Sequence, residues 1–477
     1  MTAGNGRMGA LRAERVLCFP EAPATLGRRI ADALRPAVFS RRPSKPLSPT
    51  AYLDGLRGFA AFMVYWMHHQ LWAHTGIPDG EALEYGYGHN GRHFFACLPV
   101  VRTFFSGGHI AVAVFFVISG YVLSAKPLSL MHTGELLRLD DNLASALFRR
   151  WARLYIPCMA TTFLFATSWH AFNIPTFWPQ HQPNYLAEVR HWYAEFKNWS
   201  FLFGESLFFS YNVHLWSIPV EFRGSITVYT TLLALSRATK NARLWLEVGL
   251  IFFFLYEVDG WYLSMFLAGM HICDLTLLAE NDELPRIYSR LKPYKLYITY
   301  IFFTIGIFLS GVPSAGPGLG ALQDSPGWHY LLFLKPEVMT DFKWLYLFWA
   351  AAFIVASTRH IAWLKFFFET PFCQYLGRIS YSLYLVHGPI LWTLGERIYL
   401  AVGWPGRDNI PDDVVPWKNL YPLPKTGPMF LEVRFLLPHL ILLPVTLWTA
   451  EITTKLFDEP GIKIPRWLYN KVEEPRT

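Results

Sequence analysis

The stretch Tyr52–Trp72 carries the side chains in this sequence that are best suited to chemistry. It reads YLDGLRGFAAFMVYWMHHQLW, which is long enough to cross a bilayer as one helix. Arg57 and His68 are eleven positions apart, about three helical turns, so both side chains fall on one face. Asp54 precedes Arg57 by three residues and can pair with it. This face predicts a ligand whose anionic head lies near the membrane surface and whose reacting end lies deep inside, beside His68.

Imidazole has a pKa close to neutral pH, so a buried histidine can act as a general base. We therefore predict that His68 is the catalytic base and that Asp54 holds Arg57 in place. A plainer alternative stays open, because Arg57 could reach the headgroups and His68 could bond to a neighbouring helix. His69 points about 100° away from His68 on a helix and is predicted to pack or bond structurally.

The composition is typical of a polytopic, all-α membrane protein. The 477 residues are 53% hydrophobic and only 16% charged, and the apolar residues fall in long runs. A net charge of +7 is expected of cytosolic loops in such a protein and does not indicate nucleic-acid binding. The five cysteines have neither metal-ligand spacing nor a disulfide pattern, and no metal site is predicted.

Ten spans divide the chain into a cytosolic tail over residues 1–50, a transmembrane domain over 51–455 and a second cytosolic tail over 456–477. The spans are predicted at 52–73, 109–125, 154–170, 216–236, 244–258, 260–279, 296–311, 344–358, 377–394 and 429–452. With the N-terminus cytosolic, the cytosolic segments hold 28 Lys and Arg residues and the opposite segments hold 10, so both termini are predicted inside. A weak amphipathic helix is predicted over Thr25–Val38. The glycosylation sequon at Asn198 falls on the outer or lumenal side.

Four arginines fall inside the predicted spans, and each buried guanidinium needs an anionic partner. These arginines are Arg57, Arg223, Arg378 and Arg434. The carboxylates available within the spans are Asp54, Glu221, Asp274, Glu432 and Glu451. Some of these pairs could simply join helices, so an arginine in a span is not by itself a site.

Five short blocks occur in order along the chain and together resemble the acyltransferase 3 family of membrane enzymes. They are YLDGLRGFAAFMVYWMHH, with Arg57 and His68 in an Arg-x10-His pattern; FFVISGYVLS; RRWARLYIP, with Arg150 and Arg153 in an Arg-x-x-Arg pattern; HLWSIPVEF, ending near Glu221; and LGRISYSLYLVHGPI, with His387. The closing FDEPGIKIPRW is similar to fungal-type members. Pro219 departs from the pattern, because a small polar residue is more usual there.

The resemblance implies transfer of an acyl group, most simply acetyl, from acyl-CoA to a hydroxyl group. Arg149, Arg150 and Arg153 stand at the cytosolic mouth of the third span, where they can bind the phosphates of the donor. They could equally be positive-inside anchors. In the catalytic interpretation, His68 removes the proton from an alcohol that attacks the thioester, and both direct transfer and an acyl-histidine intermediate stay open.

Three further residues are predicted to line or support the cavity: Glu221, His387 and Trp216. Glu221 could pair with Arg223, orient a histidine or form a structural ion pair. His387 precedes Gly388-Pro389, where a helix would kink and free backbone carbonyl groups. His387 could therefore line the cavity or bond to that broken backbone.

The sequence thus predicts a membrane-bound O-acyltransferase with no bound cofactor and with acyl-CoA as co-substrate. The resemblance allows glycans, lipids, sterols or secondary metabolites as acceptors, in the endoplasmic reticulum, another endomembrane or the plasma membrane. A multi-pass transporter or flippase is the main alternative, since buried charges also suit translocation. A non-catalytic scaffold is a third possibility, but it leaves the Arg57–His68 face without a purpose.

Overall fold

The computed structural model describes residues 27, 31–32, 34–36, 46–74, 83–105, 107–176, 180–316, 318–406, 410, 412–428 and 431–473. These residues form helices and loops and contain no strand, so the predicted all-α class is confirmed. The chain forms two compact units, Met1–Arg42 and Pro43–Thr477. Of the helix predicted over Thr25–Val38, the structure describes residues 27, 31–32 and 34–36, of which 27, 31–32 and 34 are helical. Most of the predicted tail 1–50, with Cys18, lies outside the described residues.

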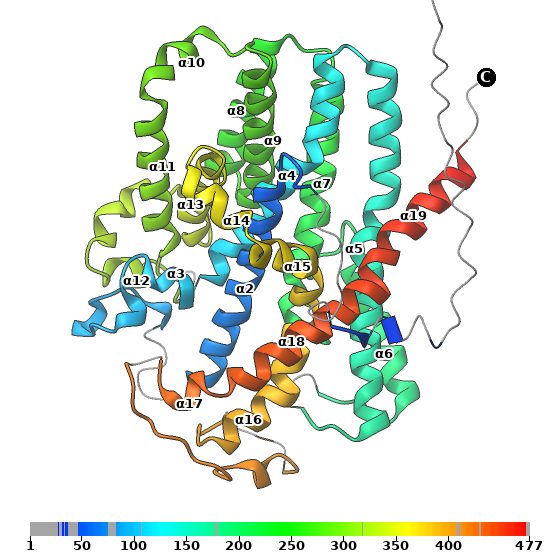
Figure 1. Ribbon diagram of the computed structural model, residues 1–477, viewed down its shortest axis with the longest axis vertical. Helices are drawn as coiled ribbons and strands as arrows, with labels where there is room; N and C mark the ends of the chain where they lie inside the picture. Colours follow the sequence, from blue (N-terminus) through cyan, green and yellow to red (C-terminus); the bar gives the residue numbers. More distant parts are fainter. Residues whose placement is uncertain are drawn as a thin grey trace, which may run out of the picture. The chain divides into compact units, whose positions relative to one another are not determined.

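A helix lies over each of the ten ranges predicted as spans (Figure 1). These helices are α2 (Ala51–His74), α4 (Gly108–His132), α5 (Leu136–Phe172), α7 (Ser217–Ala234), α8 (Lys240–Phe252), α9 (Trp261–Glu280), α11 (Lys295–Ser310), α13 (Lys343–Thr358), α15 (Pro371–Ile390) and α18 (His439–Thr453). The connecting segments contain α3 (Val101–Phe105), α6 (Tyr185–Trp199), α10 (Arg286–Leu291), α12 (Gly320–Gln323), α14 (Ala362–Phe368), α16 (Glu396–Ala401) and α17 (Val433–Leu436), and α19 (Glu459–Val472) follows α18.

Four described stretches are long and apolar enough to cross a membrane, and a bent helix pair adds a fifth. The four are Gly108–His132, Trp261–Glu280, Arg286–Ser310 and Val433–Val472. The bent pair is α13 with α14, whose axes turn by 95°. Helix α2 is not among them, because charged and histidine side chains interrupt its apolar surface.

Glycines let the helices around α2 approach one another at backbone distance. Helix α2 packs against α15 on one side and α4 on the other. A methyl group added to Gly58 of α2 would lie 2.1 Å from the backbone nitrogen of Gly377 in α15. Gly120 of α4 is packed just as closely, since a methyl group there would lie 1.9 Å from the carbonyl oxygen of Phe266 in α9. Small residues therefore hold the helices that carry Arg57 and His68 in fixed register.

The C-terminal region continues as helix beyond the last predicted span. A π-helical turn, η11 (Thr454–Asp458), joins α18 to α19. Helix α19 lies within the range 456–477 that was predicted as a tail, and it packs against α5. This contact places Asp458 beside the third predicted span.

Candidate active site

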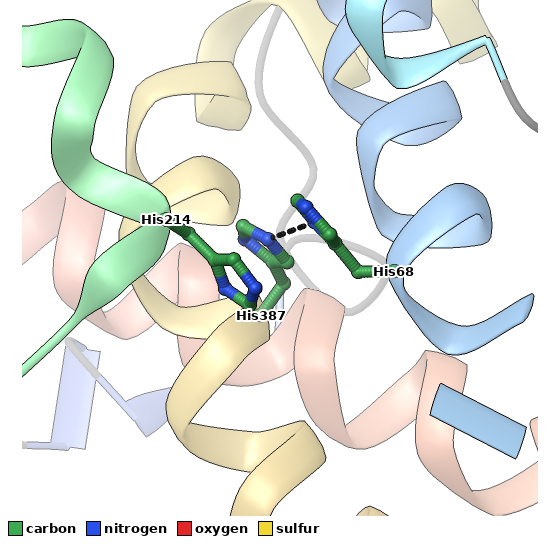
Figure 2. Close-up of side chains that lie close together, drawn as sticks. All are labelled: His68, His214 and His387. Carbon is green, nitrogen blue, oxygen red and sulfur yellow. Dashed lines mark hydrogen bonds between the residues drawn. The ribbon is translucent and has the colours of Figure 1, made fainter. Parts of the chain in front are cut away.

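Three histidines from three separate helical elements stack at the centre of the site (Figure 2). His68 comes from α2, His387 from α15 and His214 from the short 3₁₀ helix η5 (Val213–Trp216). Nδ1 of His68 lies 2.8 Å from Nε2 of His387. The ring centroids of His68 and His214 are 3.9 Å apart, and those of His214 and His387 are 4.8 Å apart. The structure thus brings His68 and His387 together and adds His214, to which the sequence analysis gave no role.

The hydrogen bonds determine which nitrogen of His68 carries a proton. Nδ1 of His387 lies 3.2 Å from the carbonyl oxygen of Leu383. A carbonyl oxygen only accepts, so this Nδ1 donates and the Nε2 of a neutral His387 must accept. His68 then donates through its own Nδ1, and its Nε2 keeps a lone pair. A neutral histidine whose Nδ1–H is held by a neighbour is oriented to accept a proton at Nε2.

A proline in α15 explains how His214 is held against that helix. Pro389 has no N–H, so the carbonyl of Leu385, four residues earlier, has no partner within the helix. The side-chain amide of Asn212 donates to this carbonyl at 2.9 Å. Asn212 also caps η5, because its Oδ1 accepts from the backbone N–H of His214 at 3.3 Å. The backbone carbonyl predicted to be freed at this kink is thus bound by the segment that carries the third histidine.

Gly388 gives the His214 ring its space. A methyl group at position 388 would lie 2.4 Å from Nδ1 of His214, well inside van der Waals contact. The dipeptide Gly388-Pro389 therefore has two separable effects. Gly388 leaves space for the ring of His214. Pro389 leaves the carbonyl of Leu385 free to accept from Asn212, which holds the backbone of the segment that carries His214.

Three histidines in one place raise the question of a metal ion. One nitrogen from each ring lies within 4.8 Å of the others, which suits the number of ligands in a zinc site. The ring planes, however, are nearly parallel, at 24° for His68 with His214 and 15° for His68 with His387. Lone pairs lie in the ring planes. The facing nitrogens of His68 and His387 are already joined by a hydrogen bond, and the nearly parallel ring of His214 lies over that of His68, so its lone pair does not point at theirs. The geometry favours a hydrogen-bonded stack over a metal centre.

A cavity of about 180 Å³ lies next to the stack and is rich in arginine. Its polar lining includes four guanidinium groups and two carboxylates: Arg57, Arg150, Arg153, Arg378, Glu221 and Asp458. Its apolar lining includes Phe115, Phe116, Leu154 and Ile218. A cavity with this charge balance suits an anionic ligand that also has an apolar part.

Tyr384 and Ser217 lie on the side of this cavity that adjoins the histidine cluster. Both line the cavity, and their hydroxyl oxygens are 2.7 Å apart. The Tyr384 hydroxyl donates to the backbone carbonyl of His214, and its ring lies 5.8 Å from that of His387. His68 itself does not line the cavity, but it is only half buried in the bundle. Tyr384 therefore links the wall of the arginine-rich cavity to the segment that carries His214 and to the ring of His387.

Arg57 has the partner that the sequence predicts. Its Nη2 lies 3.1 Å from Oδ1 of Asp54, one helical turn earlier. It also donates to the hydroxyl of Ser380 at 3.1 Å and to the carbonyl of Gly377 at 3.2 Å. These bonds join α2 to α15 at the cavity wall and fix the direction of the guanidinium.

The three arginines predicted at the mouth of the third span differ from one another in their hydrogen-bond partners. Arg150 donates to Glu221 at 2.5 Å and to Ser225 at 2.7 Å, and Arg153 pairs with Asp458. Arg149 does not line the cavity and instead donates to the backbone carbonyl of Ser145 at 2.9 Å. Two of the three arginines predicted to bind the donor thus line the cavity.

The structure also shows the surroundings of the other residues singled out in the sequence. Glu221 takes Arg150 as its partner, and Arg223 donates to backbone carbonyls of the loop after α6. Trp216 is half buried, and its ring lies 5.8 Å from that of Trp344. His69 bonds to the Tyr399 hydroxyl at 2.8 Å, in line with the structural role predicted for it. Asn198 is exposed at the end of α6.

The segment that leads into His214 is held by a buried carboxylate. Glu188 accepts from the Tyr211 hydroxyl at 2.5 Å and from the backbone N–H of Gln182 at 2.8 Å, and it lies 3.1 Å from Nε2 of His170. Burial alone would raise the pKa of Glu188, but these hydrogen bonds outweigh it and hold the pKa below its usual value. The charged carboxylate therefore stabilises the backbone just before Asn212.

Comparison with known proteins agrees with this arrangement. A family model described as an acyltransferase domain matches residues 50–423, which include every residue of the histidine stack. The chain belongs to the acyltransferase 3 family. The resemblance drawn from the five sequence blocks is thereby confirmed. No solved structure matches this acyltransferase.

Three fungal proteins are similar to this acyltransferase. O-acetyltransferase PaAT-1 of Phomopsis amygdali is 32% identical over 407 residues, which cover 76% of this chain and 77% of that protein. Acyltransferase clz18 of Cochliobolus lunatus is 23% identical, covering 89% of this chain and 96% of its own. Acyltransferase R4 of a Phoma species is 22% identical, covering 74% of this chain and 85% of its own.

Proposed function

We propose that this acyltransferase moves an acyl group, most simply acetyl, from acyl-CoA to a hydroxyl group, with His68 as the general base. Membership of the acyltransferase 3 family and the name of the O-acetyltransferase relative support the reaction class. The single observation that carries the proposal is the hydrogen bond from Nδ1 of His68 to His387, which leaves Nε2 of His68 as an acceptor. Tyr384, which lines the arginine-rich cavity, donates to the backbone carbonyl of His214 in the same histidine cluster.

The donor is bound as a co-substrate, with its nucleotide end in the arginine-lined cavity. Three features support this placement: the excess of guanidinium over carboxylate groups, the fixed direction of Arg57, and the apolar side chains beside them. Guanidinium groups bind phosphate with strong, often bidentate hydrogen bonds. The thioester then reaches inward past Tyr384 and Ser217 towards His68. This acyltransferase needs no bound cofactor for the transfer.

The chemical step balances with His68 as the only proton carrier. Nε2 of His68 accepts the proton of the acceptor hydroxyl as its oxygen attacks the thioester carbonyl carbon. A carbon–oxygen bond forms, and the carbon–sulfur bond of the tetrahedral intermediate then breaks. The departing thiolate takes the proton back from His68, which gives the ester and free CoA. His387 holds the imidazole in the required tautomer throughout.

We place all ten helices across the membrane with both termini in the cytosol, as the distribution of Lys and Arg supports. Large apolar side chains exposed on α11 and α18, such as Tyr297, Ile301 and Leu440, support contact with lipid. Asn198 then lies on the outer or lumenal side and is glycosylated. The membrane is the endoplasmic reticulum, another endomembrane or the plasma membrane.

The acceptor in this proposal is a small hydroxylated molecule, such as a secondary metabolite, with lipids and glycans as the other classes. The cavity lies within the compact unit Pro43–Thr477. The apolar wall of the cavity, with Phe115 and Phe116, suits a small apolar molecule.

The test uses the purified full-length protein in liposomes with acetyl-CoA labelled in the acetyl group. Hydroxylated small molecules, sterols, lipids and sugars are supplied in turn, and labelled ester and free CoA are measured together. We expect equal amounts of ester and CoA to form with at least one acceptor class. Movement of an acceptor across the liposome membrane without acetyl-CoA, and without ester, would favour the transporter alternative.

A further inference from the structure

Arg378 differs from the other arginines of the cavity because no residue that the structure describes bonds to it. The other three each meet a carboxylate, in the pairs Arg57–Asp54, Arg150–Glu221 and Arg153–Asp458. Within the described part of the chain, Arg378 makes neither a hydrogen bond nor an ion pair, and its Nη1 is buried without an acceptor. A charged donor that is buried without an acceptor is destabilising. Although the side chain as a whole is half-buried, its Nη1 therefore has a hydrogen-bonding position that no described residue fills.

The position of Arg378 in α15 places it beside the other polar groups of the cavity wall. The preceding residue, Gly377, and the hydroxyl of Ser380 both accept hydrogen bonds from Arg57. Ser380 and Tyr381 line the same cavity as Arg378. One turn of α15 therefore holds Arg57 in place and presents Arg378 to the same space.

A role in joining helices would give Arg378 protein acceptors, as Arg223 shows. Arg223 is also an arginine within a predicted span, and it donates to the backbone carbonyls of Leu202 and Gly204. Arg378 has no such acceptor among the described residues. Its guanidinium group is thus available to a ligand, whereas those of Arg150 and Arg153 are already bound to carboxylates.

We propose that Arg378 binds a phosphate group of the donor. This inference rests on the proposed use of acyl-CoA, and it names the arginine that meets the donor's negative charge. A planar guanidinium matches two phosphate oxygens at once, which a neutral amide or an ammonium group does less well. The paired arginines shape the cavity wall, and Arg378 supplies the positive charge that no carboxylate neutralises.

Equilibrium binding to the purified full-length protein tests this assignment. The two probes are coenzyme A and S-acetylpantetheine, which keeps the thioester arm but lacks every phosphate. We expect Arg378→Gln to raise the Kd for coenzyme A at least tenfold and to leave the Kd for S-acetylpantetheine within twofold. Arg378→Lys keeps the charge and should recover part of the affinity for coenzyme A. The matched control is Arg138→Gln, which removes an exposed guanidinium outside the cavity and should change neither constant.

Two results would overturn the inference. One is an unchanged affinity of Arg378→Gln for coenzyme A, and the other is an equal loss of affinity for both probes, which would indicate a structural role. Failure of the proposed function looks different, because the wild-type protein would then not bind coenzyme A at all. Binding by the wild type with no effect of Arg378→Gln would contradict this inference alone.

Discussion

Nδ1 of His68 lies 2.8 Å from Nε2 of His387, and the two residues are 319 positions apart in the chain. Because the other nitrogen of His387 donates to the Leu383 carbonyl, this bond makes Nε2 of His68 the basic atom. The catalytic role of one histidine therefore depends on the orientation of the other. Of the two neutral tautomers of His68, the hydrogen bond selects the one with the proton on Nδ1.

Replacing His387 should lower the turnover rate without weakening donor binding. In His387→Ala, Nδ1 of His68 loses its acceptor, so the fraction of His68 with a basic Nε2 falls. We expect kcat to fall on the order of a hundredfold, a typical share for oriented acid–base catalysis. The KM for acyl-CoA should stay within about twofold, because His387 lies outside the arginine-lined cavity. Equal changes in kcat and KM would instead indicate a collapsed site.

Adding a methyl group to Gly388 should displace His214. Gly388→Ala places a carbon 2.4 Å from Nδ1 of that ring, so the protein must shift or lose about 1–3 kcal/mol of folding stability. We expect a lower midpoint of thermal unfolding together with reduced transfer. The control is Gly249→Ala in α8, where the added carbon meets no atom within 4 Å. If Gly388→Ala behaved like the control, the stack would not have the described packing.

Removing metal ions should leave transfer unchanged. Stacked rings with interplanar angles of 15° and 24° do not aim their lone pairs at one point. We therefore expect full activity after dialysis against EDTA and in the presence of 1,10-phenanthroline. Loss of activity that returns with added zinc would mean that His68, His214 and His387 rearrange to bind an ion.

The contribution of Glu188 to stability should disappear in acid. The pKa of Glu188 is lower in the folded protein than in the unfolded chain, so its charged form adds stability above the unfolded value of ~4.3. That contribution is lost as the pH falls through the lowered pKa. Glu188→Gln should therefore unfold at a lower temperature than the wild type near neutral pH, and the two unfolding temperatures should converge as the pH falls below the lowered pKa. A constant difference across this range would show that ionisation of Glu188 is irrelevant.

The sequence predicts the helices well but the partners of buried charges poorly. A helix lies over at least part of every range predicted as a span, because long apolar runs leave few other structures for the backbone. The agreement is weakest at 244–258, where α8 ends at Phe252, and at 429–452, where α18 begins only at His439. The Asp54–Arg57 pair was also predictable, since both residues lie one turn apart on the same helix. The partner of Glu221 was not, because Arg150 is 71 positions away and comes near only when α5 packs against α7.

His214 shows what single-sequence reasoning misses. It opens the HLWSIPVEF block, but nothing near it in the chain indicates that its ring will stack on His68. That contact requires Asn212 to reach the carbonyl freed by Pro389 and Gly388 to leave room, and both conditions come from α15. The signal was present in the histidine beside the motif and in the Gly-Pro kink. Only the tertiary structure shows that His214 and the Gly388-Pro389 kink lie against each other.

The most direct test of the account is to separate turnover from donor binding in a His68 variant. In His68→Ala the arginine-lined cavity is untouched, so the Kd for coenzyme A should stay within twofold of the wild-type value. The rate of acetyl transfer should fall by a factor of roughly 10² to 10⁴, since the general base is gone. His360→Ala, an exposed histidine on the turn after α13, is the matched control and should keep both values. A folded His68→Ala protein that binds coenzyme A and transfers acetyl groups at the wild-type rate would contradict the central claim.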